Sequence, residues 1–134
     1  MGSLEEANIA VVKLFYQYLD RGDRDGAYAN VMADDCILHE APELPYGGVY
    51  RGREVMQDVL ARVMQGFDEV SCTIRNYLAG GDEVVVHLHL SGVGRASRKA
   101  FATPIMELWR IRDGKAVELR PFLFDPAAIA GVLA

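Results

Sequence analysis

The sequence predicts an α+β fold, in which helices come first and a sheet of mainly antiparallel strands comes last. Apolar residues recur every three or four positions early in the chain, whereas the second half alternates apolar and polar residues between short turns. The 134 residues, of which 51% are hydrophobic and 25% charged, are enough for one globular domain and too few for two. This order of elements favours one curved sheet that wraps around a helix.

Four helices are expected, and two of them have recognisable starts. Ser3 is followed three residues later by Glu6, which is the pattern of a helix N-terminus. Asp125 precedes a proline, so we expect it to cap the last helix. The expected helices cover residues 4–19, 25–32, 53–64 and 127–133.

One short strand and four longer ones complete the pattern. The segments 80–82 and 113–114 contain glycine and aspartate and read as tight turns, while residues 41–48 hold two prolines and two glycines and read as a loop. The expected strands cover residues 36–39, 69–79, 83–92, 100–111 and 116–124.

Charge and composition exclude several classes of protein. The chain has 14 basic and 19 acidic residues, a net charge of −5, which disfavours binding to nucleic acid or to an anionic membrane. An acidic N-terminus and the lack of a long apolar run predict a soluble, cytoplasmic protein. Cys36 and Cys72 form no metal-binding pattern, so no metal site is expected and both are predicted to be buried thiols.

Glu107 is the most informative single residue. The two-residue period of a strand places it on one face with Ile105, Trp109 and Ile111, and this face should point inward. A carboxyl group in such surroundings loses hydration, so we expect its pKa to lie above the usual value for a glutamate. A neutral acid of this kind can donate a hydrogen bond. The alternatives are an acid paired with an arginine, or a strand whose other face is the buried one.

Several local motifs, in this order, support a family assignment. The motifs are Gly22-Asp23-Arg24-Asp25-Gly26, Ala33-Asp34-Asp35, Gly48-Val49-Tyr50-Arg51-Gly52 and Leu108-Trp109-Arg110-Ile111-Arg112-Asp113-Gly114-Lys115. With these motifs the chain resembles the NTF2-like superfamily, and within it the ketosteroid isomerase and SnoaL-like polyketide cyclase branch, over nearly its whole length. The resemblance implies a single cone-shaped domain over residues 1–134. This fold hosts several enzymes and also binders without catalytic activity.

The resemblance implies roles for two carboxyl groups. Glu107 lies at the strand position where the isomerase carries its protonated acid, and Glu40 lies close to the position of the general base. Neighbouring strand residues point to opposite faces, so only one of His39 and Glu40 can face a cavity, and Glu40 is favoured. A solvated carboxylate at the end of a strand is the alternative for Glu40.

A phenol donor and apolar substrate contacts would complete such a site. Phe15 occupies the position where the resemblance leads us to expect a tyrosine on the first helix. Tyr18 shares the helix face of Phe15 and is the candidate replacement, with a plain core role as the alternative. The apolar side chains expected to line a cavity are Phe15, Tyr46, Trp109, Leu119 and Phe122.

These residues predict a small-molecule enzyme in which carboxyl groups move a proton next to a carbonyl in an apolar cavity. No cofactor is implied. The alternative is a ligand-binding or structural dimer without activity, and epoxide hydrolysis ranks low because a set of paired aspartates and an arginine is not predicted on the inward faces.

Two histidines bear on assembly. His87 and His89 alternate with the apolar Val86, Leu88 and Leu90, so they should face away from the core. The resemblance implies that the outer sheet face joins two subunits. We therefore expect a homodimer, with these histidines at the interface or in solvent, and not in a metal site, since a third ligand is lacking.

Overall fold

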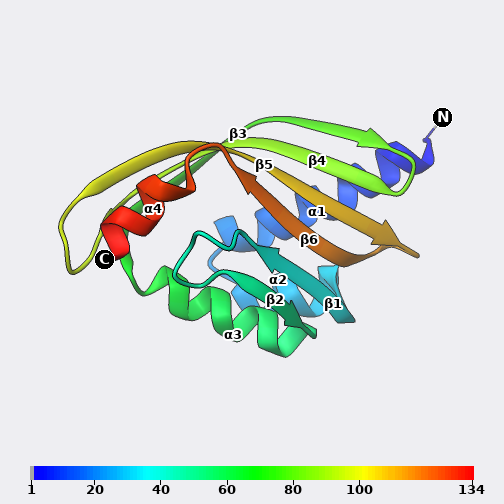
Figure 1. Cartoon of the computed structure of the whole chain (residues 1–134). Helices are drawn as coiled ribbons and strands as arrows, with labels where there is room; N and C mark the ends of the chain where they lie inside the picture. The colour runs from blue at the N-terminus through cyan, green and yellow to red at the C-terminus, as the bar shows by residue number, and fades with distance from the viewer. Residues whose placement is uncertain (1) are drawn as a thin grey trace.

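The structure is a computed structural model and describes residues 2–134. It contains four helices and one six-stranded sheet (Figure 1). In this part of the chain, no helix is long and apolar enough to cross a membrane. The elements are α1 (Leu4–Asp20), α2 (Arg24–Val31), β1 (Met32–Glu40), β2 (Gly48–Arg51), α3 (Arg53–Met64), β3 (Phe67–Gly80), β4 (Glu83–Gly94), β5 (Ala100–Arg112), β6 (Lys115–Leu123) and α4 (Pro126–Leu133).

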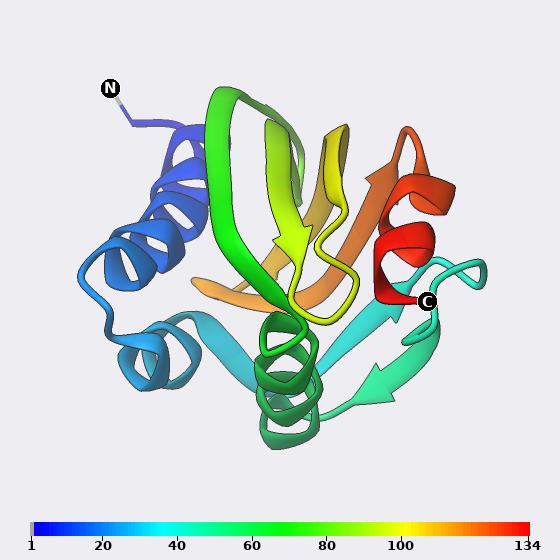
Figure 2. The same cartoon turned by 90° about the vertical axis from the view of Figure 1, so that its left-hand side faces the viewer.

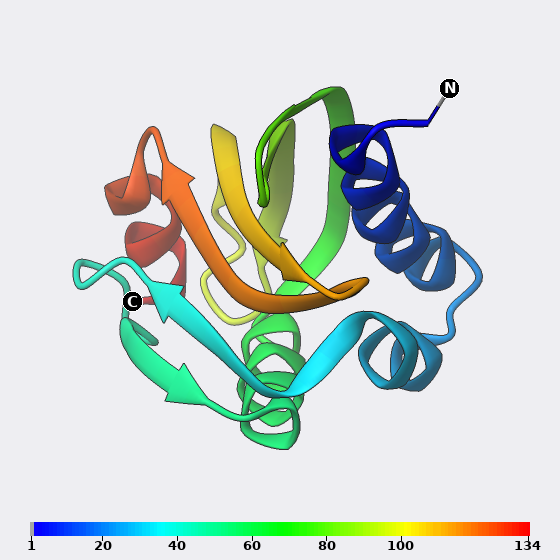
Figure 3. The ribbon, with the colours of Figure 1, turned by 90° about the vertical axis from the view of Figure 1, so that its right-hand side faces the viewer.

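The sheet has the strand order β2-β1-β6-β5-β4-β3. Strands β3 to β6 form an antiparallel meander, β2 is antiparallel to β1, and β1 runs parallel to β6 (Figure 3). The sheet is strongly curled, with α1 and α2 at one side, α4 at the other and α3 between them (Figure 2). The predicted α+β class and the curved, mainly antiparallel sheet are therefore confirmed.

The structure corrects the prediction at β1 and β2. Strand β1 begins at Met32 directly after α2, because the segment 33–35 continues the strand across a shift of register between Met32 and Ile37. Residues 48–51 form the edge strand β2 against the end of β1. This strand is missing from the prediction, which places Gly48 in a loop and gives residues 49–51 no strand. Its four residues are too few for a recognisable alternation. Gly52, with a φ of 98°, then turns the chain into α3.

The main core lies between α1, α2 and the concave side of the sheet. Phe15 packs edge-on against Trp109 and Tyr28, with ring centroids 5.2 and 5.4 Å apart. Such aromatic pairs stabilise a core beyond the area that they bury. Both expected helix caps are present, since the Ser3 and Asp125 side chains accept hydrogen bonds from backbone N–H groups of α1 and α4.

Candidate active site

A cavity of about 480 Å³ lies between the concave side of the sheet and the helices. This volume suits an organic molecule of moderate size. Its wall is mostly apolar and includes residues from α1, α2, α3, α4 and strands β1, β3, β4, β5 and β6. Among the predicted contact residues, Phe15, Tyr46, Trp109 and Leu119 line it.

Glu107 lines this cavity from β5. Its Oε1 atom accepts a hydrogen bond from the hydroxyl of Tyr16. The same Oε1 accepts a second hydrogen bond from Nε1 of Trp109, with a distance of 3.2 Å between the two atoms. Burial raises the pKa of the Glu107 carboxyl, and the two donors act in the opposite direction. Since both donors meet Oε1, a proton on this group belongs on Oε2, the oxygen without such partners.

Glu40 lines the same cavity from the end of β1. The residue is only 9% exposed, and its carboxyl has no hydrogen bond or ion pair with the described residues. Burial, followed by the charge of Glu107, raises the pKa of Glu40 from 4.5 to about 8. The structure therefore brings together the two predicted carboxyl groups, and both favour the neutral form more than an exposed glutamate does.

Tyr16 is the site residue that the sequence reasoning missed. Phe15 stands where a tyrosine is expected, yet the next residue, Tyr16, supplies a phenol that donates to Glu107. Phe15 itself is buried against Trp109. A signal was available, because Tyr16 lies four residues after the buried Val12 and so shares its side of the helix.

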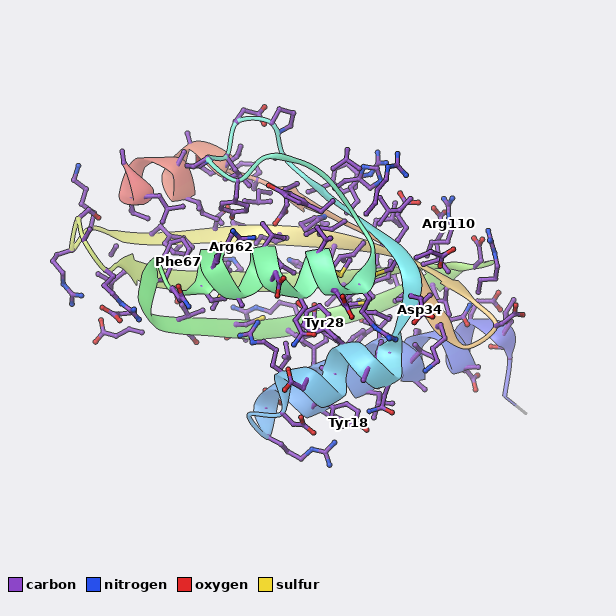
Figure 4. The ribbon with its side chains drawn as sticks, turned by 90° about the horizontal axis from the view of Figure 1, so that it is seen from below. Tyr18, Tyr28, Asp34, Arg62, Phe67 and Arg110 are labelled. Atoms are coloured by element: carbon purple, nitrogen blue, oxygen red, sulfur yellow. The ribbon has the colours of Figure 1, made fainter. Side chains whose placement is uncertain are left out.

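Three predicted site residues lie away from the cavity. His39 points to the opposite side of β1 from Glu40, and its Nε2 lies 3.4 Å from Glu118 Oε1 and 3.3 Å from an Arg120 nitrogen. Phe122 is 54% exposed, because its neighbours on β6 take the inward positions. Tyr18 lies on the outer side of the helix pair, beneath the guanidinium of Arg21 (Figure 4).

Tyr46 lies at the end of the cavity near Glu40. It comes from the loop between β1 and β2, where its carbonyl accepts a hydrogen bond of 2.8 Å from the hydroxyl of Tyr50. Burial and the nearby Glu40 carboxyl raise the pKa of its phenol. Tyr46 therefore stays protonated at neutral pH and can act as a hydrogen-bond donor at this end.

The cavity opens beside the edge strand β3. Three of its lining residues, Asp20, Val70 and Cys72, are exposed to solvent, which marks this side as the opening. Cys72 was expected to be buried, but it lies on an edge strand that has a neighbour on one side only. Cys36 is buried as predicted.

The curled α+β sheet with a cavity on its concave side defines an NTF2-like protein, and a family model for the SnoaL-like domain matches residues 12–119. The chain belongs to this SnoaL-like family. No curated protein matches the chain.

Solved structures share the fold. An NTF2-like protein from Burkholderia thailandensis is 25% identical, with a TM-score of 0.84 over 95% of this chain and 97% of that chain. A protein of unknown function from Xanthomonas campestris is 26% identical, with a TM-score of 0.83 over 95% and 98%. A Jannaschia protein provisionally named a SnoaL-like polyketide cyclase is 20% identical, with a TM-score of 0.83 over 100% and 96%.

Proposed function

We propose that this protein is a small-molecule enzyme of the ketosteroid isomerase or polyketide cyclase type, which transfers a proton next to a carbonyl group. The observation that carries the proposal is that Glu40 and Glu107 line one largely apolar cavity, with Glu107 held by Tyr16 and Trp109. Paired carboxyl groups in different environments are the usual means of dividing acid and base roles.

Glu40 is the general base in this proposal. A base whose pKa is about 8 combines a usable ionised fraction at neutral pH with a strong tendency to take up a proton. Its carboxylate removes a proton from the carbon beside the substrate carbonyl, and the electron pair of that C–H bond forms an enolate. Glu40 then returns the proton to another carbon, so the carboxylate is regenerated.

Glu107 is the neutral acid. Ionising both carboxyls would place two negative charges in one apolar cavity, so one of them stays protonated. The hydrogen bonds from Tyr16 and Trp109 hold Oε1, which leaves the proton on Oε2 available to the enolate oxygen. A donor that is already oriented can be worth two or three orders of magnitude in rate.

The experiment follows proton exchange on a simple ketone. We expect the protein to accelerate deuterium uptake at the carbon beside the carbonyl of 2-tetralone in D₂O, as measured by NMR. Glu40→Gln should abolish this acceleration, and Glu107→Gln should lower it by about 100-fold or more. Glu43→Gln is the matched control, because Glu43 is an exposed acid of the neighbouring loop. Wild-type activity in Glu40→Gln, or no acceleration by the wild type, would refute the proposal and favour a binding protein without catalytic activity.

We further propose that the protein forms a homodimer through the outer face of the sheet. Met106 and Phe122 are 42% and 54% exposed and lie directly opposite each other on β5 and β6. His87 pairs with Met106 in the neighbouring strand, so it belongs to the same face. Exposed apolar side chains of this size, in contact across strands, are typical of interaction surfaces.

A further inference from the structure

Arg24 is a cation in the wall of the cavity. It is the first residue of α2, and among the described lining residues it is the only basic one. No carboxylate of the described residues lies within ion-pair distance of its guanidinium, whereas Arg53 is paired with Asp34 at 2.9 Å. A positively charged group without a protein counter-ion, beside a ligand-sized space, can bind an anion.

Arg24 and Tyr28 lie four residues apart on α2, and both line the cavity. Tyr28 is 2% exposed, and burial raises the pKa of its phenol to about 12, while the nearby Arg24 acts to lower it. Tyr28 also senses the charge of Glu107. Figure 4 shows Tyr28 between α2 and α3, with its ring toward the interior. Arg24 and the Tyr28 hydroxyl thus form a pair of donors in the cavity wall.

We propose that the ligand of this cavity carries a carboxylate that binds to Arg24 and Tyr28 while its carbonyl or phenol lies between Glu107 and Glu40. The placement of the carbonyl end rests on the proposed function, whereas the carboxylate end rests on Arg24 alone.

The charges in the cavity determine the orientation in which such a ligand binds. A carboxylate between Glu40 and Glu107 would lie beside the charge of the ionised Glu40, so it is favoured beside the cation Arg24 instead. Asp20 lies at the opening, where it is exposed to water and its charge is screened. The net charge of −5 disfavours anions in general, so a preference for an anionic ligand requires a local cation.

The test compares two probes that share the naphthol and differ in one substituent, a charged carboxylate or a neutral amide. The naphthol 6-hydroxy-2-naphthoate has an anionic carboxylate, and 6-hydroxy-2-naphthamide is its neutral counterpart. Binding of each to the full-length protein is measured by naphthol fluorescence at low salt and pH 7. A charge-assisted hydrogen bond predicts that the wild type binds the carboxylate about tenfold more tightly or better.

Variants test whether the preference for the carboxylate probe over the amide probe depends on Arg24. Arg24→Gln should bring the affinity ratio of the two probes close to one, Arg24→Lys should keep most of it, and Asp20→Asn should increase it. Arg21→Gln is the control, because Arg21 lies over the ring of Tyr18 outside the cavity. A wild-type ratio near one, an unchanged ratio in Arg24→Gln, or no binding of either probe would overturn the proposal.

The same titrations separate this inference from the proposed function. Glu107→Gln should weaken both probes by the same factor, because it alters the end that holds the naphthol. If Glu107→Gln changes neither affinity while Arg24→Gln removes the preference, the carboxylate subsite stands and the proposed catalytic role of Glu107 fails. The converse result leaves the proposed function in place and removes the subsite.

Discussion

Replacing Glu40 with glutamine should stabilise the protein relative to the wild type, and this gain should grow as the pH rises. In the unfolded chain the Glu40 carboxyl ionises with its usual pKa of 4.5, whereas burial and Glu107 raise the pKa to about 8 in the folded state. The unfolded state therefore loses its proton first as pH increases, and the wild type loses stability between these two values. Glutamine fills nearly the same volume and has no charge to bury.

The size of the effect follows from the two pKa values. At about 1.4 kcal/mol per pH unit, ionisation of Glu40 lowers the free energy of unfolding by about 3 kcal/mol at pH 7 and by about 5 kcal/mol above pH 9. Below pH 4 the contribution vanishes, since both states carry the proton. The gain of Glu40→Gln over the wild type should therefore grow with pH.

Urea unfolding at pH 4, 7 and 9 measures this difference directly. Glu43→Gln is the control, because an exposed acid should leave the difference from the wild type nearly constant. Glu107→Gln provides a second check: the pH-dependent gain should persist in this background, because burial is the larger cause of the raised pKa of Glu40. A gain for Glu40→Gln that stays the same from pH 4 to pH 9 would refute the placement of this carboxyl in the cavity.

Four further predictions test the site and the assembly. Glu107→Gln should be neutral or stabilising near pH 7 in urea unfolding, because it removes a buried acid yet keeps an acceptor for Tyr16; a loss above about 2 kcal/mol would mean that Glu107 is ionised and paired. Tyr16→Phe should lower stability by about 1 kcal/mol and slow exchange on 2-tetralone, and unchanged values would remove Tyr16 from the site. Sedimentation equilibrium should show a dimer of the 14.8 kDa chain that Phe122→Asp dissociates, and a wild-type monomer at micromolar concentration would exclude it. Elemental analysis should find no stoichiometric metal, since no three ligating side chains cluster within residues 2–134; zinc or iron retained through gel filtration would contradict this.

Residues on the strands were largely predictable from the sequence. A strand alternates its side chains strictly between two faces, so the buried Ile105 and Trp109 fix the direction of Glu107. The same rule places Glu40, and not His39, toward the cavity. The periodicity of the apolar residues also predicts the order of helices and strands, and therefore the α+β class, which the structure confirms.

Residues on the helices and the short edge strand needed the tertiary structure. A helix turns by about 100° per residue, so its broad apolar side includes Phe15 and Tyr18, while the phenol that donates to Glu107 belongs to Tyr16. Arg24 begins a short, mostly polar helix, and its place in the cavity wall depends on how α2 packs beside α1 and the sheet. The sequence by itself determined the strand faces on which Glu40 and Glu107 lie, because the period of a strand is local. The folded chain decided which helical side chains meet Glu107 and Glu40, because that depends on the rotation and docking of helices against residues distant in sequence.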